Sequence, residues 1–306
     1  MSDPTVVSLL PATTEILYAL DCEPAAVSHE CDYPPAATEK PAANRLRIDP
    51  DVSSEEINDQ LESASDVYEI RRDVLEDIDP DIVVTQGVCD VCAVDEVLVE
   101  DAVRDLGLDC EILTTDPHRL DDVFGDIERI GAAVGREDRA ADLVADLRER
   151  VRAVEDRVPD GERPRTLVCD WMSPPMIAGH WVPELVEKAG GEYGLTDAGA
   201  YSAPEDWADV VAFDPEVLVA APCGFGMAQT LDNLDELRDR EGWQDLAAVE
   251  SGHVFAVDGH HYVNRPGPRL VDTLELLAWC LHPDAFETPP ESDARRVAER
   301  VAERSA

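Results

Sequence analysis

Four cysteines lie in segments whose chemistry suits metal binding or redox reactions. Cys89 and Cys92 form a C-x-x-C pair directly after an apolar, strand-like segment. Such a pair can hold one metal ion with two thiolates or close a redox disulfide. Cys31 and Cys223 lie in two other predicted loops. These four could form a zinc or iron–sulfur site, contact a ligand through their thiols, or be small, half-buried loop residues. The remaining cysteines are expected to be buried apolar residues: Cys22, Cys110, Cys169 and Cys280.

Histidines and arginines also stand in predicted loops. His29, His180 and the pair His260–His261 could coordinate a metal ion or donate hydrogen bonds. Arg265 and Arg269 follow the last predicted strand, and a guanidinium group suits carbonyl, phosphate or carboxylate partners. The two arginines could equally form a buried ion pair.

The large excess of acidic over basic residues limits the kinds of binding partner that the protein can have. The chain has 306 residues, 44% of them apolar, which predicts a folded protein of about two domains. Its 68 acidic residues against 25 basic ones give a formal net charge of −43. A surface this negative repels phosphate backbones and anionic lipids, so nucleic acid and membrane-surface partners are excluded. Because lysine occurs only twice, we interpret the charge as a halophilic surface, kept soluble in concentrated salt.

We expect no targeting signal from the sequence as it stands. No stretch of about 18 apolar residues occurs, so no membrane span is expected. Residues 1–4 carry no basic charge, and the apolar stretch 6–10 stops at Pro11. If Met1 is the native start, a cytoplasmic location and reduced cysteines are expected. The alternative is the extracellular face of a membrane, with the start trimmed or assigned wrongly.

The first third of the chain alternates between strand and helix patterns. Residues 5–10 are apolar and β-prone, and a helix capped by Thr13 or Thr14 is expected to follow. Strands at 82–85 and 109–114 flank a predicted helix at 94–106. This alternation predicts an α/β fold with a largely parallel sheet. From residue 117 to 158 only apolar stripes at helical spacing occur, and the second stripe predicts a helix over 136–158, roughly 30 Å long.

The same pattern then returns. Residues 165–169 form a second strand of the first type, and 213–219 repeat 78–84 around an Asp-Pro pair. Residues 252–257 echo 107–113 in the same order. The fold class is therefore α/β, with two similar Rossmann-like lobes joined by a long backbone helix. We expect lobes at 1–116 and 161–306, a helical segment at 117–160, and a ligand cleft between the lobes at the carboxyl ends of the strands. A helix over 269–281 is also expected.

Several motifs carry a family resemblance over nearly the whole chain. They are Val7-Ser8-Leu9-Leu10-Pro11-Ala12-Thr13-Thr14-Glu15, Cys31-Asp32-Tyr33-Pro34-Pro35, Asp79-Pro80-Asp81, Ser173-Pro174-Pro175, Ala189-Gly190-Gly191 and Arg265-Pro266-Gly267-Pro268-Arg269. With these the chain resembles the vitamin B12 (cobalamin)-binding proteins of ABC importers, within the periplasmic binding proteins that have a helical backbone.

The resemblance implies ligand binding, not catalysis. Tyr33 would line the corrinoid cleft, and the Pro174-Pro175 loop with Trp171 would form the opposite wall. A flat, amphipathic corrinoid needs aromatic faces and a few polar groups, while Trp243 and Trp279 are expected in the core. The candidate ligand-binding residues are Asp32, Tyr33, Tyr68, Trp171, His180, Trp181, Trp207, Phe225, Tyr262 and Arg265.

The resemblance also implies a permease partner for a monomeric protein. Asp73 matches the acidic residue with which the family's first lobe docks; Ala208, between Asp206 and Asp209, takes the matching place in the second lobe. Loss of docking would fit an intracellular carrier. Two alternatives stay open. One is a metal-dependent enzyme or metallochaperone of tetrapyrrole metabolism using Cys89 and Cys92, and the other is a ferric-chelate or heme binder.

Overall fold

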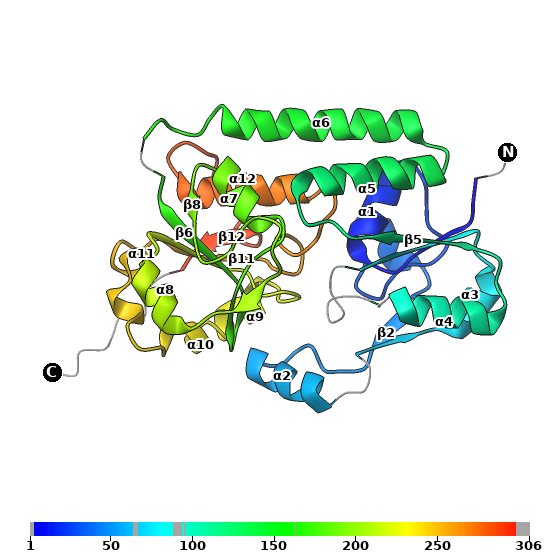
Figure 1. Ribbon diagram of the computed structural model, residues 1–306, viewed down its shortest axis with the longest axis horizontal. Helices are drawn as coiled ribbons and strands as arrows, with labels where there is room; N and C mark the ends of the chain where they lie inside the picture. Colours follow the sequence, from blue (N-terminus) through cyan, green and yellow to red (C-terminus); the bar gives the residue numbers. More distant parts are fainter. Residues whose placement is uncertain (1–2, 64–66, 88–93, 95, 162, 298–306) are drawn as a thin grey trace. The chain divides into compact units, whose positions relative to one another are not determined.

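The computed structural model describes residues 3–63, 67–87, 94, 96–161 and 163–297 (Figure 1). The chain divides into two compact units. Unit 1 comprises residues 1–52, 56–150 and 265–269, and unit 2 comprises 53–55, 151–264 and 270–306. The short segment Arg265–Arg269 therefore packs with unit 1, although its neighbours in sequence on both sides belong to unit 2.

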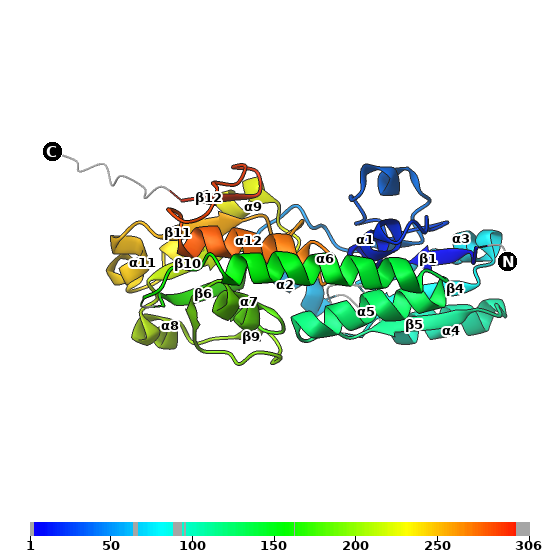
Figure 2. The ribbon, with the colours of Figure 1, turned by 90° about the horizontal axis from the view of Figure 1, so that it is seen from above.

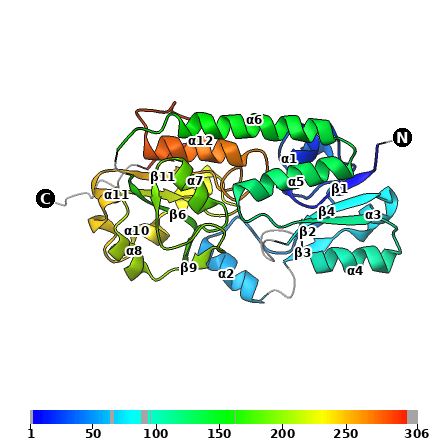
Figure 3. The same ribbon diagram turned by 45° about the horizontal axis from the view of Figure 1, so that its top comes forward.

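Unit 1 is built on a three-stranded parallel sheet. Its strands are ordered β1 (Val6–Ser8), β4 (Ile82–Gln86) and β5 (Glu111–Thr115). All five residues of β4 are buried, as expected for a central parallel strand covered on both faces. Helix α4 (Glu96–Leu106) packs on one face, and α1 (Pro11–Ala19) and α5 (Leu120–Ala133) lie together on the other (Figures 1 and 3). The other elements of this part are η1 (Pro35–Glu39), β2 (Asn44–Leu46), α2 (Ser54–Ser63), β3 (Tyr68–Ile70) and α3 (Arg72–Ile78).

Unit 2 is built on a larger sheet of seven strands. Strands β11 (Val254–Val257), β10 (Val217–Ala220), β6 (Arg165–Met172) and β8 (Glu192–Tyr193) are parallel. Strands β12 (Ala294–Arg296), β7 (Pro175–Ile177) and β9 (Ala203–Pro204) pair antiparallel at its sides. The helices are α7 (Val182–Lys188), α8 (Trp207–Phe213), α9 (Met227–Asp232), α10 (Asp235–Arg238), η2 (Trp243–Asp245), α11 (Ala247–Glu250) and α12 (Leu270–Leu281). Trp243 and Trp279 are buried, which confirms the prediction that they belong to the core.

The long helix predicted over 136–158 is α6 (Glu137–Glu155), unbroken in Figure 2. The chain passes from unit 1 to unit 2 within it, after Arg150. The prediction of an α/β fold with repeated halves is confirmed. Among the described residues, no helix combines the length and the apolar character that crossing a bilayer would need.

The two units share the same backbone conformation at the Asp-Pro repeat. Helices α3 and α8 each have seven residues, and each ends at an aspartate with a left-handed backbone, Asp79 (φ 48°) and Asp214 (φ 50°). Aspartate tolerates this conformation better than most residues with a Cβ. A proline follows each aspartate, and the next buried strand, β4 or β10, begins directly afterwards. The Asp-Pro signal in the sequence therefore marks the same helix-to-strand turn in both units.

The repeat extends to one side-chain contact. The carboxylate of Asp81 accepts a hydrogen bond from the backbone N–H of Thr5 at 2.7 Å, just before β1. The carboxylate of Glu216 accepts one from the N–H of Arg165 at 3.0 Å, at the start of β6. Each acidic side chain thus ties the start of the first strand to the start of its parallel neighbour.

The start of α1 differs from the prediction. The helix begins at Pro11, and neither Thr13 nor Thr14 caps it. Proline suits the first helical position because that N–H has no partner within the helix and its φ is already helical. The Thr13 hydroxyl lies 2.7 Å from the Ser8 Oγ, and the Thr14 hydroxyl donates to the same oxygen at 2.8 Å. The two hydroxyl groups therefore join the helix to the end of β1.

Candidate ligand-binding site

A buried group of charged side chains supports the predicted Tyr33 loop in unit 1. Glu15, on α1, has a side chain only 2% exposed. Its Oε1 accepts a hydrogen bond from Nη2 of Arg269 at 2.5 Å and lies 3.5 Å from Nη1 of Arg265. Burial raises the pKa of Glu15, and the hydrogen bond and charge of Arg269, with the charge of Arg265, act in the opposite direction. We call Glu15, Asp32, Arg265 and Arg269 the charged cluster.

Tyr33 rests directly on this cluster. The guanidinium carbon of Arg269 lies 4.7 Å from the centre of the Tyr33 ring, within cation–π range. The Tyr33 side chain is nevertheless 49% exposed. Glu15 therefore fixes Arg269, and Arg269 supports an aromatic ring that keeps half of its surface accessible.

Asp32 ties the same loop to the cluster. Its carboxylate pairs with Arg265, which also donates from Nη2 to the backbone oxygen of Glu30 at 3.4 Å. Arg265 is itself buried. For Arg265 these contacts agree with the alternative of a buried ion pair, while the prediction that Asp32, Tyr33 and Arg265 bind a ligand stays a prediction. Glu15 and Arg269 were not among the predicted ligand-binding residues, although both lie in the resemblance motifs.

Cys31 lies beneath this loop and does not fit the predicted metal site. The side chain is buried, and its Sγ lies 3.1 Å from the Thr14 hydroxyl. Burial raises the pKa of the Cys31 thiol to about 12. A metal ligand must be a thiolate, so this environment works against coordination. Cys223 lies in unit 2, where its N–H donates to the Asp170 oxygen at 2.9 Å; Cys89 and Cys92 lie outside the described residues.

In unit 2, three neighbouring strands bring candidate residues to one edge of the sheet. Trp171 lies near the carboxyl end of β6, and its ring contacts that of Phe225, beyond β10, at 5.4 Å between centres. The N–H of His260, beyond β11, donates to the Phe225 oxygen at 3.0 Å. Phe225 is fully buried and supports Trp171, which is partly exposed. The indole N–H of Trp171 has no hydrogen-bond partner among the described residues. We call Trp171 and Phe225 the aromatic pair.

A second group of rings lies in the loop after β7. His180 has a positive φ of 50°, and its ring lies 5.4 Å from that of Trp181 and 5.1 Å from that of Tyr201. Trp181 is buried, with its indole N–H donating to the Val263 oxygen at 2.7 Å. Gly179 allows the close approach of the two loops, because a Cβ there would lie 2.3 Å from the Ala200 oxygen. Tyr201, exposed and absent from the predicted residues, stands in a run of small residues that could have indicated a surface loop.

Three other aromatic residues were predicted to bind the ligand, and their surroundings differ from those of Tyr33 and Trp171. Tyr68 is buried in the apolar core of unit 1 with Val7, Leu9 and Val83, and its ring lies 5.9 Å from that of His29. The short strand β3 places this side chain against the core. Trp207 stacks on Trp243 at 6.2 Å, and its indole N–H donates to the Glu241 oxygen at 2.9 Å. Tyr262 is partly buried beside His261.

Helices α3 and α8 carry the predicted docking acids. Asp73 is exposed in the first turn of α3 and pairs with Arg71 at 2.8 Å. Asp206 caps α8 by accepting the N–H of Ala208 at 3.0 Å. Asp209 is exposed in the first turn of that helix. Each helix therefore presents one exposed carboxylate in its first turn, displaced by one position between the two.

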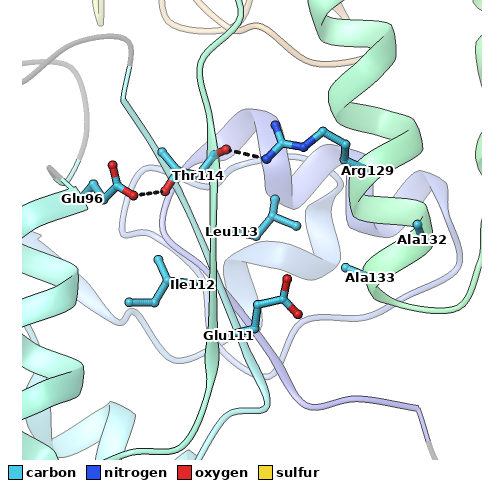
Figure 4. A pocket seen from close by; sticks show the side chains of 8 residues that line it. All are labelled: Glu96, Glu111, Ile112, Leu113, Thr114, Arg129, Ala132 and Ala133. Atoms are coloured by element: carbon cyan, nitrogen blue, oxygen red, sulfur yellow. Dashed lines mark hydrogen bonds between the residues drawn. The ribbon is translucent and has the colours of Figure 1, made fainter.

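A separate hollow of about 540 Å³ lies over β5 and α5 (Figure 4). Three of its polar residues already bond to one another: Thr114 donates to Glu96 at 2.7 Å, and Arg129 donates to the Thr114 oxygen at 3.0 Å. None of the predicted site residues lines it. The hollow is therefore a groove along the edge strand β5, and Arg129 is the partner of the Thr114 carbonyl in it.

Comparison with known proteins identifies the family to which the chain is similar. A model described as periplasmic binding protein matches residues 6–260. The cobalamin-binding protein of Halobacterium salinarum is 28% identical over 167 residues, which are 53% of this chain and 44% of the relative, so the match spans less than half of that relative. A periplasmic heme-binding protein from Pseudomonas aeruginosa has a TM-score of 0.71 at 19% identity, covering 97% of this chain and 100% of that one. The periplasmic vitamin B12-binding protein BtuF of Vibrio cholerae has a TM-score of 0.65 at 21% identity, covering 91% and 96%.

Proposed function

The chain belongs to the periplasmic binding protein family, and we propose that it is the solute-binding component of an ABC-type importer with a corrinoid as its ligand. The observation that carries the choice of ligand class is the half-exposed Tyr33 ring, supported by Arg269 and, through it, by the buried Glu15. A flat macrocycle gains most from an aromatic face that is already held in place before binding.

The aromatic pair of unit 2 supports the same ligand class. Trp171 is partly exposed and braced by Phe225, so it offers a second large aromatic surface. The name of the Halobacterium salinarum relative, cobalamin-binding protein, also favours a corrinoid.

Titration with hydroxocobalamin in concentrated salt tests this proposal. We expect saturable binding, measured by quenching of tryptophan fluorescence, and weakening of about tenfold or more for Tyr33→Ala. Phe286→Ala is the matched control, because Arg157 lies over the Phe286 ring at the same 4.7 Å and this ring is not a candidate ligand contact. Hemin and a ferric siderophore, titrated in parallel, test the alternative ligands. Tighter binding of either one than of cobalamin would overturn the choice of a corrinoid.

The proposed role is binding without turnover. Burial raises the thiol pKa of five described cysteines, against the thiolate that a metallochaperone or a thiol enzyme would use: Cys22, Cys31, Cys110, Cys169 and Cys280. Cobalamin recovered after prolonged incubation should therefore be unchanged by mass spectrometry and absorbance. Recovery of an altered corrinoid would contradict a purely binding role.

The permease partner is part of the proposal. The exposed first-turn carboxylates of α3 and α8, Asp73 and Asp209, occupy nearly equivalent places in the two units. We expect the double variant Asp73→Ala, Asp209→Ala to bind cobalamin normally but to stimulate the ATPase of its transporter less. Unchanged stimulation would remove these two side chains from docking.

A further inference from the structure

A histidine pair, His260 and His261, follows strand β11 in unit 2, and the imidazole rings of the pair have no role in the aromatic surface described so far. The N–H groups of His260 and His261 donate to Oδ1 of Asp258 at 3.0 and 2.8 Å. The N–H of Met227, at the start of α9, donates to Oδ2 at 3.2 Å. Three backbone groups therefore fix this buried carboxylate.

The fixed carboxylate also orients the ring of His261. Oδ1 of Asp258 lies 3.1 Å from Nδ1 of His261. An ionised carboxylate only accepts, so Nδ1 carries a proton and Nε2 carries a lone pair in the neutral ring. A carboxylate behind an imidazole in this way orients histidines that coordinate metal ions.

The oriented ring stands at the same edge of the sheet as the aromatic pair. The N–H of His260 donates to the backbone oxygen of Phe225, whose ring braces Trp171. The side chain of His261 is 40% exposed. An imidazole ring with a set orientation is therefore partly exposed at the sheet edge that carries the surface proposed to take a corrinoid.

We propose that Nε2 of His261 coordinates the cobalt of a bound corrinoid at an axial position occupied by water in solution. The proposal rests on the proposed function. The Co–O bond to water breaks, a Co–N bond to imidazole forms, and the water leaves with the oxidation state of cobalt unchanged. Imidazole is a suitable donor for this metal. The protein would thereby prefer corrinoids whose axial position can exchange.

Cobinamides separate this coordination from stacking, because they lack a nitrogen base of their own. In diaquacobinamide the axial waters exchange, whereas in dicyanocobinamide both positions are held by cyanide. We expect the absorbance bands of the diaqua form to shift on binding to the protein. His261→Ala should abolish the shift and weaken binding of the diaqua form about tenfold or more, with dicyano binding changed less than about twofold.

Electron paramagnetic resonance gives a second readout independent of affinity. The cobalt(II) form of cobinamide bound to the protein should show a triplet splitting from one nitrogen, changing to a doublet when the histidines carry ¹⁵N. His260→Ala is the matched control and should keep both the splitting and the absorbance shift.

Three results would overturn the inference. The first is tight binding of both cobinamides without a spectral shift, which leaves the proposed function intact. The second is a shift that survives His261→Ala or disappears with His260→Ala instead. The third is equal weakening of both cobinamides by His261→Ala, which indicates a structural ion pair with Asp258. Failure of both cobinamides and of hydroxocobalamin to bind would remove the proposed function as well.

Discussion

In unit 1 the exposed ring of Tyr33 rests on a charged side chain, whereas in unit 2 the ring of Trp171 packs against another aromatic ring. The support in unit 1 is ionic, since Glu15 and Asp32 hold Arg265 and Arg269 within the charged cluster. The support in unit 2 is Phe225, a buried ring whose backbone accepts from His260.

This difference separates two ways to hold an aromatic surface in place. Removing one member of a group of buried ions leaves its partners buried without compensation. Each single substitution in the charged cluster should therefore lower the free energy of unfolding strongly. Ring packing is adaptable, so the aromatic pair should lose affinity in steps with the area removed. We therefore expect substitutions in the charged cluster to lower the free energy of unfolding, and loss of an exposed ring in either unit to lower the affinity for the ligand.

The largest expected effect is on stability. Glu15→Ala leaves the buried Arg265 and the partly buried Arg269 with Asp32 as their remaining acid and should lower the free energy of unfolding by about 3–5 kcal/mol. Urea denaturation in concentrated salt measures it. Glu69→Ala is the control, because Glu69 also pairs with two arginines, Arg45 and Arg47, but at the surface. Its loss should leave stability nearly unchanged, and equal losses for the two variants would contradict a buried cluster.

A second buried carboxylate in unit 1 has a single arginine partner and can be compared with Glu15, which has two. Asp126 is buried on α5 and has one arginine partner, Arg129, at 2.8 Å. Burial raises its pKa from 3.8 to about 6, against the charge of Arg129. The folded state therefore holds a proton that the unfolded state loses, and this contribution to stability is lost as the pH rises from about 4 to 6.

Asp126→Asn should remove this pH dependence. At pH 4 the variant and the parent protein should have similar stability, and by pH 7 the variant should be more stable by about 1–3 kcal/mol. Denaturation at several pH values measures the difference. A difference that stays flat between pH 4 and 7 would show that Asp126 has an ordinary pKa in the folded protein.

The sequence predicted those parts of the fold that depend on local pattern. The Asp-Pro repeat at Asp79 and Asp214 and the helix α6 were predicted because turns and helical stripes are local signals. The start of α1 was not, because the hydroxyls of Thr13 and Thr14 find partners at the end of β1 that no local pattern reveals.

The candidate site was predicted less completely for the same reason. The contact between Glu15 and Arg269 joins residues 254 positions apart. Neither residue type nor spacing tells an ion pair at that separation from two solvated charges. Tyr68 shows the converse, since an aromatic residue in a short strand was indistinguishable from a surface residue until its core neighbours were placed.

Removing one ring from each unit compares their contributions to binding. Tyr33→Ala and Trp171→Ala should each weaken cobalamin binding about tenfold, because one aromatic face is worth roughly 1.5–3 kcal/mol. Tyr33→Phe should retain most of the affinity, since it keeps the ring over Arg269. Titration calorimetry of the three variants decides the matter. Unchanged affinity in both alanine variants would remove these two rings from the site.

The smallest expected effect concerns Cys31, which lies under the Tyr33 loop but does not share its exposure. Its thiol is buried against Thr14, and its pKa of about 12 keeps it protonated at neutral pH. Cys31→Ser should therefore change cobalamin affinity by less than about twofold and leave the metal content of the purified protein unchanged. Elemental analysis and titration of this variant check both expectations. Loss of a bound metal ion would show that Cys31 is a thiolate ligand after all, and the support of Tyr33 would then include a metal centre as well as the charged cluster.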